Sequence, residues 1–374
     1  MRRRDCTKFT SAPSLQPIIT TDAELAALGA ELATQPRLAL DTEFLRERTY
    51  HAQLCLVQLG AAGRAVCVDP LAVTDLGPLG QLLTAPQVLK VMHASRQDLE
   101  VLLPLARGVG PIFDTQVAAA LAGFPAQVGY ADLVRRLLGQ DLPKSHTRTD
   151  WARRPLSPAQ LEYALDDVRY LLPLAAALEE RLAQAGRSAW LAEELAALED
   201  PTSLSTEPQD AWRRLRGVRE LDPGRVRLAQ ALAAWRERTA IAHDRPRGWI
   251  LEEGVLRELV LRVPRSVADL EAIEGLPAGL IRKRGAELLE CVAAAQVPDP
   301  APPLPGRTRP DPQRTALLKR LAGVTQQVAG ELKVAPELLA TRRDLELLAD
   351  GEQDVAVLRG WRRAVLGETL LAQL

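Results

Sequence analysis

The stretch LALDTEF, residues 38–44, decides the fold of the first part of this chain. Its residues follow the pattern of a half-buried strand, in which side chains two positions apart share a face. Asp41 and Glu43 therefore point to one side, and the leucines and Thr42 to the other. Two carboxylates on one face need a counter-charge, and a divalent cation such as Mg²⁺ or Mn²⁺ prefers such hard oxygen ligands. A basic side chain or a solvated strand end are the alternatives.

Further strands and helices surround this stretch. Residues 37–44, 53–60 and 65–70 read as strands joined by short turns, which predicts an antiparallel meander. Residues 88–94 read as a buried strand. Helical patterns follow at 95–106, 115–122, 130–138 and 158–184. The order indicates a mixed α/β domain at the start of the chain.

A second acidic motif lies on the last of these helices, in LEYALDDVRYL, residues 161–171. Apolar residues recur at helical spacing and form a core-facing stripe. The neighbouring face holds Tyr163, Asp166 and Asp167, and both acids lie about one turn from the tyrosine. Because carboxylates close together repel, this face also predicts a positive partner. Helix geometry alone does not choose between the two aspartates.

The third acid is Asp98 in VMHASRQDLEVLL, where a buried strand gives way to a helix. An acid in the first turn of a helix is favoured by the helix dipole alone, so Asp98 by itself is only a helix-start acid. His93 ends the same strand, and either a substrate contact or a satisfied core histidine explains it.

The bulk composition excludes several classes of protein. The chain has 374 residues and a net charge of −1, so no global field attracts nucleic acid or membrane. The four cysteines form no CxxC pair, which predicts reduced thiols and a cytoplasmic location. No apolar run reaches membrane-spanning length, and we expect residues 1–16 to be a frayed tail rather than a secretory signal.

Two breaks divide the rest of the chain. We expect a linker at 199–211 and a proline-rich linker at 298–312, which leaves helical units at 212–297 and 313–374. From Trp212 to Arg247 there are ten arginines and four acids. Such a patch suits RNA phosphate contacts, although a solvated arginine-rich helix is the alternative.

Taken together, LALDTEFLRERTYHAQLCLVQLG, HASRQDLEVL, KSHTRTDWARRPLSPAQLEYALDDVRYLLPL and HDRPRGWIL resemble the ribonuclease D family, 3′→5′ exoribonucleases of the DEDDy type. The resemblance implies an α/β ribonuclease-H-like exonuclease domain at 17–198, with a mixed sheet flanked by helices. It implies two all-α HRDC-type domains after it, at 212–297 and 313–374.

The resemblance also implies roles for individual residues. Asp41 and Glu43 match the first exonuclease motif, Asp98 the second, and Tyr163 with Asp167 the third, whose spacing selects Asp167 over Asp166. The four acids would hold two divalent metal ions, Mg²⁺ or Mn²⁺, and Tyr163 would orient the attacking water. Simple packing is the alternative for Tyr163.

The same resemblance suggests how substrate is held and what it is. We expect His93, Gln58, Lys144 and Arg148 to bind substrate, with a ladder-edge glutamine as the alternative for Gln58. The expected substrates are the 3′ ends of tRNA precursors and small structured RNAs, cut to 5′-mononucleotides by a monomeric enzyme with no membrane partner. A 3′→5′ DNA exonuclease and a catalytically inactive RNA-binding scaffold are the competing functions.

Overall fold

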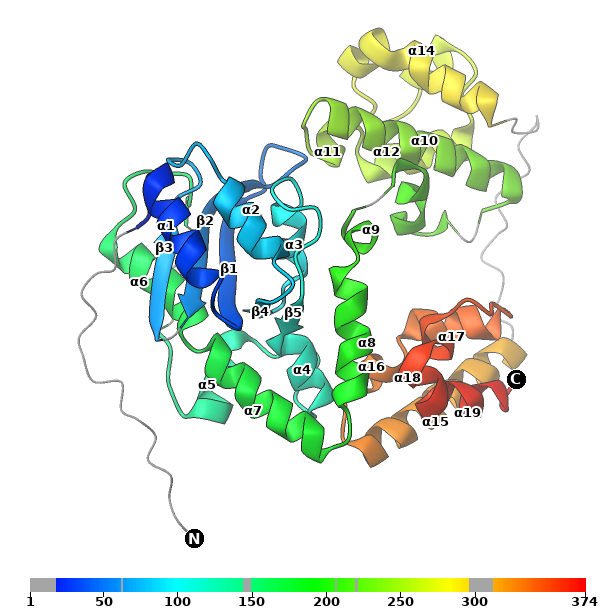
Figure 1. Ribbon diagram of the computed structural model, residues 1–374. Coiled ribbons are helices and arrows are strands. Elements are labelled where there is room, and N and C mark those ends of the chain that lie inside the picture. The colour runs from blue at the N-terminus through cyan, green and yellow to red at the C-terminus, as the bar shows by residue number, and fades with distance from the viewer. Residues whose placement is uncertain (1–17, 62, 144–148, 206, 219–220, 296–311) are drawn as a thin grey trace. The chain divides into compact units, whose positions relative to one another are not determined.

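The computed structural model describes residues 18–374 except for 62, 144–148, 206, 219–220 and 296–311 (Figure 1). It divides into two compact units. The first comprises the described residues up to Leu45 together with Leu54–Glu199, and the second comprises Arg46–Gln53 together with the described part of Asp200–Leu374. The connection between the first two strands therefore belongs to the second unit.

The first unit is built on a five-stranded mixed sheet in the order β3-β2-β1-β4-β5. Its strands are β1 (Arg37–Leu45), β2 (Gln53–Ala61), β3 (Arg64–Val68), β4 (Leu89–Met92) and β5 (Ile112–Asp114). β2 and β3 pair antiparallel, as predicted, whereas β4 is parallel to both β1 and β5. The mixed sheet confirms the predicted fold class.

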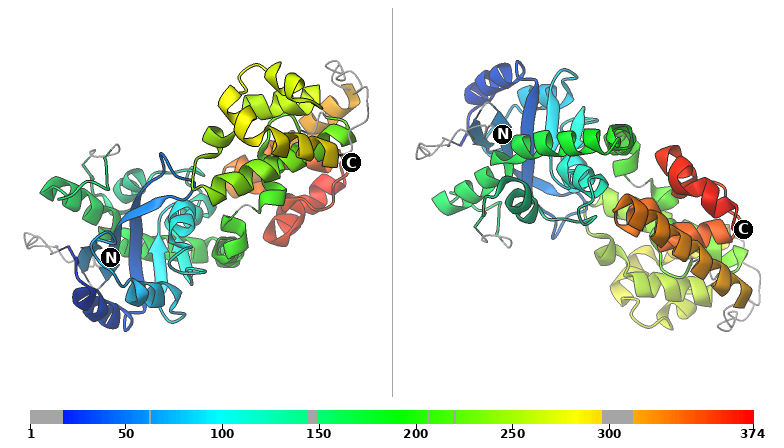
Figure 2. Two further views of the ribbon diagram at one scale, coloured as in Figure 1. Left: turned by 90° about the horizontal axis from the view of Figure 1, so that it is seen from above. Right: turned by 90° about the horizontal axis from the view of Figure 1, so that it is seen from below.

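Helices cover both sides of this sheet (Figure 2). The helices of the first unit are α1 (Asp22–Leu32), α2 (Gly77–Thr84), α3 (Arg96–Leu102), α4 (Thr115–Leu121), α5 (Tyr130–Leu138), α6 (Pro158–Arg169), α7 (Leu171–Gln184) and α8 (Ser188–Glu199). α1 and α2 lie on one side, and α6 and α7 on the other. The apolar positions of β1 and β2 are therefore buried on both faces, with Leu38, Ala39 and Leu40 fully enclosed.

The helix predicted at 158–184 was wrong as a single element, because it is divided at Tyr170 into α6 and α7. The Tyr130 hydroxyl lies in the gap, where it donates to the Asp166 carbonyl at 2.9 Å and accepts from the Tyr170 N–H at 3.1 Å. It thus replaces the backbone bond that would join these residues in a continuous helix. Pro173, in the first turn of α7, has no N–H to continue the ladder.

The second unit is helical. Its elements are α9 (Pro201–Leu204), η1 (Pro208–Arg214), α10 (Pro223–Ala242), α11 (Arg247–Ile250), α12 (Glu253–Arg262), α13 (Val267–Glu271), α14 (Ala278–Ala294), α15 (Pro312–Leu332), α16 (Pro336–Leu339), α17 (Arg342–Ala349), η3 (Ala356–Leu358), α18 (Gly360–Arg362), η4 (Arg363–Gly367) and α19 (Glu368–Leu371). α10, α12 and α14 enclose one apolar core. The segment expected to be a linker at 199–211 contains α9 and part of η1, whereas the tail 1–16 and nearly all of the linker 298–312 lie outside the described residues.

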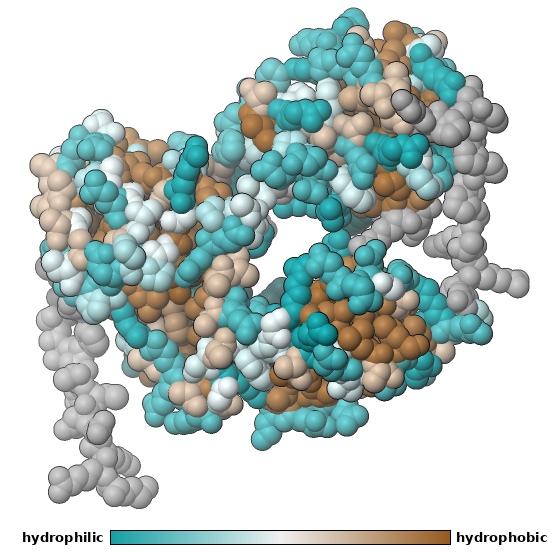
Figure 3. Space-filling view, turned by 45° about the vertical axis from the view of Figure 1, so that its right-hand side comes forward, coloured by the Kyte–Doolittle hydropathy of each residue, from teal (hydrophilic) through white to brown (hydrophobic). Residues whose placement is uncertain are grey.

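The surface carries a mixture of hydrophilic and hydrophobic side chains. On the face in Figure 3, hydrophilic side chains surround and interrupt the hydrophobic ones. None of the described helices is both long and apolar enough to cross a membrane. The described cysteines, Cys55, Cys67 and Cys291, are free thiols.

Candidate active site

Three of the predicted acids meet at one point of the first unit. Asp41 and Glu43, two residues apart on β1, share a face of the strand, and Asp167 approaches from α6. Each of the three offers a carboxylate oxygen, and these oxygens all lie within 4.8 Å of one another. All three side chains are partly exposed, so an ion can reach them. The arrangement suits a divalent cation.

A glycine allows α6 to reach the sheet. A Cβ added to Gly60 of β2 would lie 3.2 Å from the Ala39 Cβ of β1 and 3.5 Å from the Val168 carbonyl oxygen of α6. Gly60 thus lets the helix backbone approach the strands closely, one residue from Asp167. α6 begins with a capping box, in which Gln160 N–H donates to the Ser157 hydroxyl at 3.3 Å and Ser157 N–H donates to the Gln160 side chain at 2.8 Å.

Asp98 lies close to these acids but is held separately. It is buried in the first turn of α3, and the Thr42 hydroxyl donates to its Oδ1 at 2.5 Å. Within the described chain, the group of oxygens within 4.8 Å comprises Asp41, Glu43 and Asp167, and Asp98 is not part of it. Thr42 was predicted only to face away from Asp41. No local pattern indicates that its hydroxyl bridges β1 to α3, because that contact joins residues distant in the chain.

Burial and mutual repulsion keep protons on these acids. Burial, then the carboxylates of Asp98, Asp167 and Glu43, raises the pKa of Asp41 well above its usual range. Burial, followed by the charges of Asp167 and Asp98, raises the pKa of Glu43 to about 8. The pKa of Asp167 rises to about 7 through burial and then the Asp166 charge. Burial also raises the pKa of Asp98 to about 7, although the Thr42 hydrogen bond opposes it. A bound cation would relieve the repulsion among the carboxylates of such a cluster.

Asp166 has a different role from its neighbour. Its carboxylate forms an ion pair with Arg169 in the next turn of the same helix. Arg169 also contacts Glu162 at 2.9 Å, so Asp166 belongs to an internal pair rather than to the group with Asp41 and Glu43. The geometry therefore favours Asp167, the residue that the family spacing selects.

Tyr163 lies one turn before Asp167 on α6 and is half-buried. Burial, then the charges of Asp167, Glu43 and Asp41, raises the pKa of its phenol, so the hydroxyl stays protonated at neutral pH. Its ring stacks on Trp151, with centroids 6.2 Å apart and planes inclined by 28°. Trp151 is 5% exposed and belongs to the apolar core between α6 and the sheet. This burial identifies Trp151 as a core-packing residue.

The residues expected to bind substrate give a mixed result. The two ring nitrogens of His93 contact the Thr115 hydroxyl at 2.9 Å and the Val128 carbonyl at 3.1 Å, which favours the core-histidine alternative. Gln58 is fully buried, and neither amide atom has a hydrogen-bond partner among the described residues. Lys144 and Arg148 lie outside the described residues. Substrate binding by all four stays a prediction.

A mixed sheet whose central strand carries two of the clustered carboxylates, followed by a helical unit, is the arrangement expected of a nuclease with an accessory domain. Comparison with protein families agrees: residues 16–183 match a 3′-5′ exonuclease domain, and residues 226–292 match an HRDC domain. The second match lies inside the helical unit predicted at 212–297. The expected HRDC-like character of 313–374 stays a prediction.

Full-length relatives narrow the class further. Ribonuclease D of Granulibacter bethesdensis is 42% identical over 100% of this chain and 95% of its own length. Ribonuclease D of Pseudomonas paraeruginosa is 40% identical, over 98% and 99%. The crystal structure of Escherichia coli RNase D, described as an exoribonuclease involved in structured RNA processing, superposes with a TM-score of 0.84 at 34% identity and covers 96% of this chain and 98% of that one.

The chain belongs to the ribonuclease D family and is a 3′→5′ exoribonuclease. An exonuclease domain of this type uses two divalent metal ions, and the acidic triad of Asp41, Glu43 and Asp167 provides the oxygen ligands that such ions require.

Proposed function

We propose that Asp41, Glu43, Asp98 and Asp167 hold two divalent cations, Mg²⁺ or Mn²⁺, and that Tyr163 orients the water that attacks the terminal RNA phosphodiester. The observation that carries this proposal is the gathering of three carboxylates within 4.8 Å, each with a raised pKa. Burying several like charges is costly unless cations compensate them. The products would be 5′-mononucleotides.

Each chain residue then has a definite task. When bound, the cations would supply Lewis-acid activation of water and neutralise charge on the phosphate and the leaving oxygen. Tyr163, which stays protonated, would donate or accept a hydrogen bond and so fix the position of the water. Thr42 would hold the Asp98 carboxylate in one orientation through its 2.5 Å hydrogen bond.

For the substrate, we propose tRNA precursors and other small structured RNAs, processed in the cytoplasm by a monomer. The support comes from the E. coli relative, which is described as acting in structured RNA processing. The decisive test compares the purified protein on 3′-extended tRNA precursor and on a DNA strand of the same sequence, with Mg²⁺, Mn²⁺ or EDTA. We expect stepwise shortening of the RNA with either metal and none with EDTA. Equal rates on DNA would favour the DNA exonuclease instead.

The exposed arginines of the second unit support a part in RNA binding, although the patch is smaller than its composition suggests. Arg225 and Arg236 of α10 are buried, and the indole N–H of Trp235 donates to Glu287 at 2.7 Å. Arg214, Arg216, Arg238 and Arg245 are exposed.

Replacing these four arginines with glutamine should weaken binding of tRNA precursor severalfold. It should also flatten the salt dependence of binding, by up to about one unit of slope for each replaced arginine that touches a phosphate. A filter-binding series in KCl measures both. The control is a double variant in which glutamine replaces Arg135 and Arg136, two exposed arginines on α5. If the four-arginine variant had the wild-type slope, the patch would not contact the RNA backbone.

A further inference from the structure

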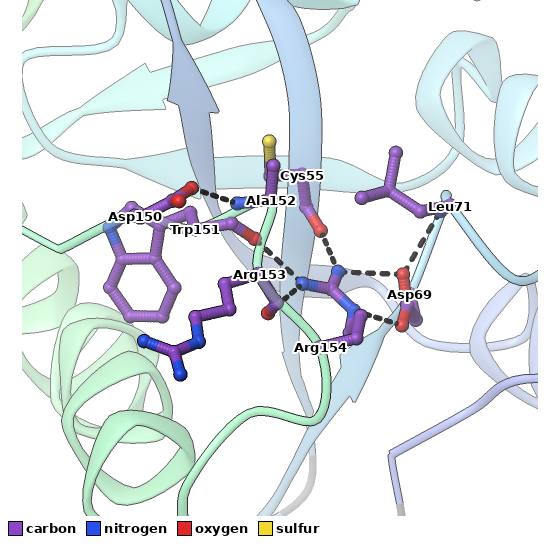
Figure 4. Close-up of polar contacts among 8 residues, drawn as sticks. All are labelled: Cys55, Asp69, Leu71, Asp150, Trp151, Ala152, Arg153 and Arg154. Atoms are coloured by element: carbon purple, nitrogen blue, oxygen red, sulfur yellow. Dashed lines mark hydrogen bonds and ion pairs between the residues drawn. The ribbon is translucent and has the colours of Figure 1, made fainter.

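A network of polar contacts surrounds Arg154, in the segment that precedes the helix of Tyr163 (Figure 4). The segment just before α6 runs past strands β2 and β3 and includes Trp151 and Arg154. The Arg154 guanidinium points toward the sheet, where it meets Asp69 and the Cys55 carbonyl, whereas the Arg153 guanidinium points elsewhere. We call Arg154 and its partners Asp69, Cys55 and Trp151 the Arg154 network.

Arg154 uses all five of its N–H donors, four of them within this network and one to its neighbour Arg153. Nε donates to Asp69 Oδ2 at 2.6 Å, and Nη2 donates to Asp69 Oδ1 at 2.8 Å and to the Cys55 carbonyl at 2.7 Å. Nη1 donates to the carbonyls of Trp151 at 2.7 Å and Arg153 at 3.1 Å. An arginine is the side chain that presents five donors in a fixed planar fork. A lysine offers three donors from a single atom.

The acid of the pair is itself anchored. Asp69 follows β3 directly, is 4% exposed, and accepts a further hydrogen bond from the Leu71 N–H at 3.0 Å. Its backbone N–H donates to the Ile19 carbonyl at 2.9 Å. Because Asp69 and the Cys55 carbonyl are fixed to two strands, Arg154 ties the Trp151 backbone to the rigid sheet. A bidentate, largely buried pair of this kind is stronger than an exposed ion pair.

The network continues from Trp151 to the reaction centre. The Trp151 ring lies in the core formed with Cys55, Leu56, Ala164 and Leu165, and it also stacks on the ring of Tyr163. The tyrosine ring is thus supported by an indole whose backbone Arg154 holds. Asp167, one turn further along the same helix, is placed by the helix and needs no such support.

We propose that Arg154 and Asp69 are positioning residues for Tyr163, acting through the stacked ring of Trp151. The inference rests on the proposed catalytic role of the Tyr163 hydroxyl. It adds that the Arg154 network keeps this hydroxyl in a fixed position. Displacement of a reacting group by about 1 Å can lower a rate by about a hundredfold, so loss of this support should slow the reaction without weakening RNA binding.

The test is a double-mutant cycle between Arg154→Lys and Tyr163→Phe in the full-length protein. Single-turnover cleavage of a short 3′-end-labelled RNA is measured at saturating RNA and Mg²⁺, and RNA affinity is measured in Ca²⁺ or EDTA. Arg154→Lys should lower the single-turnover rate by about ten- to a hundredfold, with RNA affinity within about twofold of wild type. In the Tyr163→Phe background, the same substitution should change the rate by less than about twofold, because the hydroxyl it positions is already gone.

A matched control is Arg64→Lys. Arg64 lies on β3 and pairs with Glu31 at 3.0 Å, but both side chains are about half exposed, so its rate should equal that of wild type. Trp151→Phe provides a second variant that leaves the Arg154–Asp69 pair intact and shrinks the stacked ring. It should show the same lack of additivity with Tyr163→Phe, which guards against an Arg154→Lys protein that fails to fold.

The possible results distinguish the positioning role of Arg154 from the catalytic role of the Tyr163 hydroxyl. A slow Tyr163→Phe enzyme with a wild-type rate for Arg154→Lys would overturn the positioning role alone. Losses that multiply in the double variant would also overturn it, since Arg154 would then act by another route. A Tyr163→Phe enzyme as fast as wild type would overturn both the role of the hydroxyl and the role of its support.

Discussion

Both units of this protein bury charged side chains, but they do so in opposite ways. In the first unit, Asp41, Glu43 and Asp167 gather, and burial followed by the charges of neighbouring carboxylates raises the pKa of each. In the second unit, Glu237 of α10 is fully buried, yet it accepts a hydrogen bond from the Tyr50 hydroxyl and faces Arg247 at 3.7 Å. Both sites bury a charge. They differ because groups of the chain itself compensate the charge of Glu237, whereas the acids of the first unit lie beside further acids.

This difference explains why only one of the two clusters is a candidate for chemistry. Glu237 joins the segment Arg46–Gln53 to α10. Asp244, just after α10, also accepts hydrogen bonds from the Tyr50 and His51 N–H groups at 3.0 Å each. The Tyr50 hydroxyl and the opposite charge of Arg247 compensate Glu237 there, although Glu237 Oε2 accepts no hydrogen bond from the described residues. This is a structural arrangement. Like charges left together are costly to the fold, and they persist where an external cation completes the site.

The largest expected effect comes from removing one of the clustered acids. Asp41→Ala, Glu43→Ala, Asp98→Ala and Asp167→Ala should each nearly abolish hydrolysis, because each removes oxygen ligands from the proposed metal site. The fold should remain, and the melting temperature of the metal-free protein should hold or rise as repulsion falls. Steady-state cleavage of RNA and thermal melting measure the two quantities.

Asp166→Ala is the matched control for that series. Asp166 is the neighbour of Asp167 on the same helix, but it pairs with Arg169 and not with the clustered acids. Its loss should leave the rate within a few-fold of wild type. A severe loss for Asp166→Ala with a mild one for Asp167→Ala would reverse the assignment.

A smaller loss of turnover is expected at Tyr163, whose proposed part is to orient the water and which carries no charge. Tyr163→Phe keeps the ring stacked on Trp151 and deletes the hydroxyl. If the hydroxyl orients water, turnover should fall by about 10²–10⁴-fold, while KM changes little. Single-turnover kinetics of the wild-type, Phe and Ala proteins measure this. A Phe variant close to wild type with a much slower Ala variant would reduce Tyr163 to a packing residue.

Sequence reasoning succeeded where a short-range rule applied. The two-residue period of a strand placed Asp41 and Glu43 on one face. The family spacing selected Asp167 over Asp166, and the structure brings Asp167 to those two acids, while its role as a metal ligand stays a prediction. Sequence reasoning failed where distant residues decide local structure. The Tyr130 hydroxyl breaks the helix between Asp166 and Tyr170, although Pro173 was a local signal for that break. β5 has three residues, too few to show a period.

The same limit applies within the site. The hydrogen bond from Thr42 to Asp98 spans 56 positions of sequence, and the pair of Arg154 and Asp69 spans 85. The internal contacts of His93, to Thr115 and Val128, require the end of β4 to lie beside the start of α4 and the chain that follows α4. Residue types and periods predict which side chains lie on the same helix or strand. Only the packed fold shows which side chains make contacts between different helices and strands.

The pH dependence of stability should reveal the uncompensated acids. In the unfolded chain these acids lose their protons near pH 4, whereas Glu43, with its pKa of about 8, and Asp167, with its pKa of about 7, keep theirs longer in the folded protein. Between these limits the unfolded state binds fewer protons, so the free energy of unfolding of the metal-free protein falls as pH rises from about 4 to about 8. Added Mn²⁺ should restore stability, and more so at pH 8 than at pH 6, because cations displace those protons.

Denaturant unfolding in EDTA and in Mn²⁺ across this range measures the effect. Asp167→Asn is the appropriate reference, since His93 and Lys90 titrate equally in both proteins and cancel in the difference. The wild-type protein should lose more stability with rising pH than the variant. Identical pH slopes would mean that the acids are not strained by one another.

The smallest effect is expected at the compensated site, and it should fall on stability rather than on chemistry. Glu237→Ala removes the acceptor of the Tyr50 hydroxyl and the partner of Arg247. Leaving a half-buried donor unsatisfied should cost about 1–3 kcal/mol in the free energy of unfolding. The rate on a short single-stranded RNA should stay near that of wild type, since no clustered acid is touched. Glu237→Gln, which keeps an acceptor for Tyr50, should recover part of the lost stability. Glu237→Ala could instead slow cleavage as much as Tyr163→Phe does, with little change in stability. In that case, a change at α10 would have to reach the clustered acids through the segment Arg46–Gln53, which directly follows the strand of Asp41 and Glu43. Compensation within the chain would then no longer separate a structural cluster from a functional one.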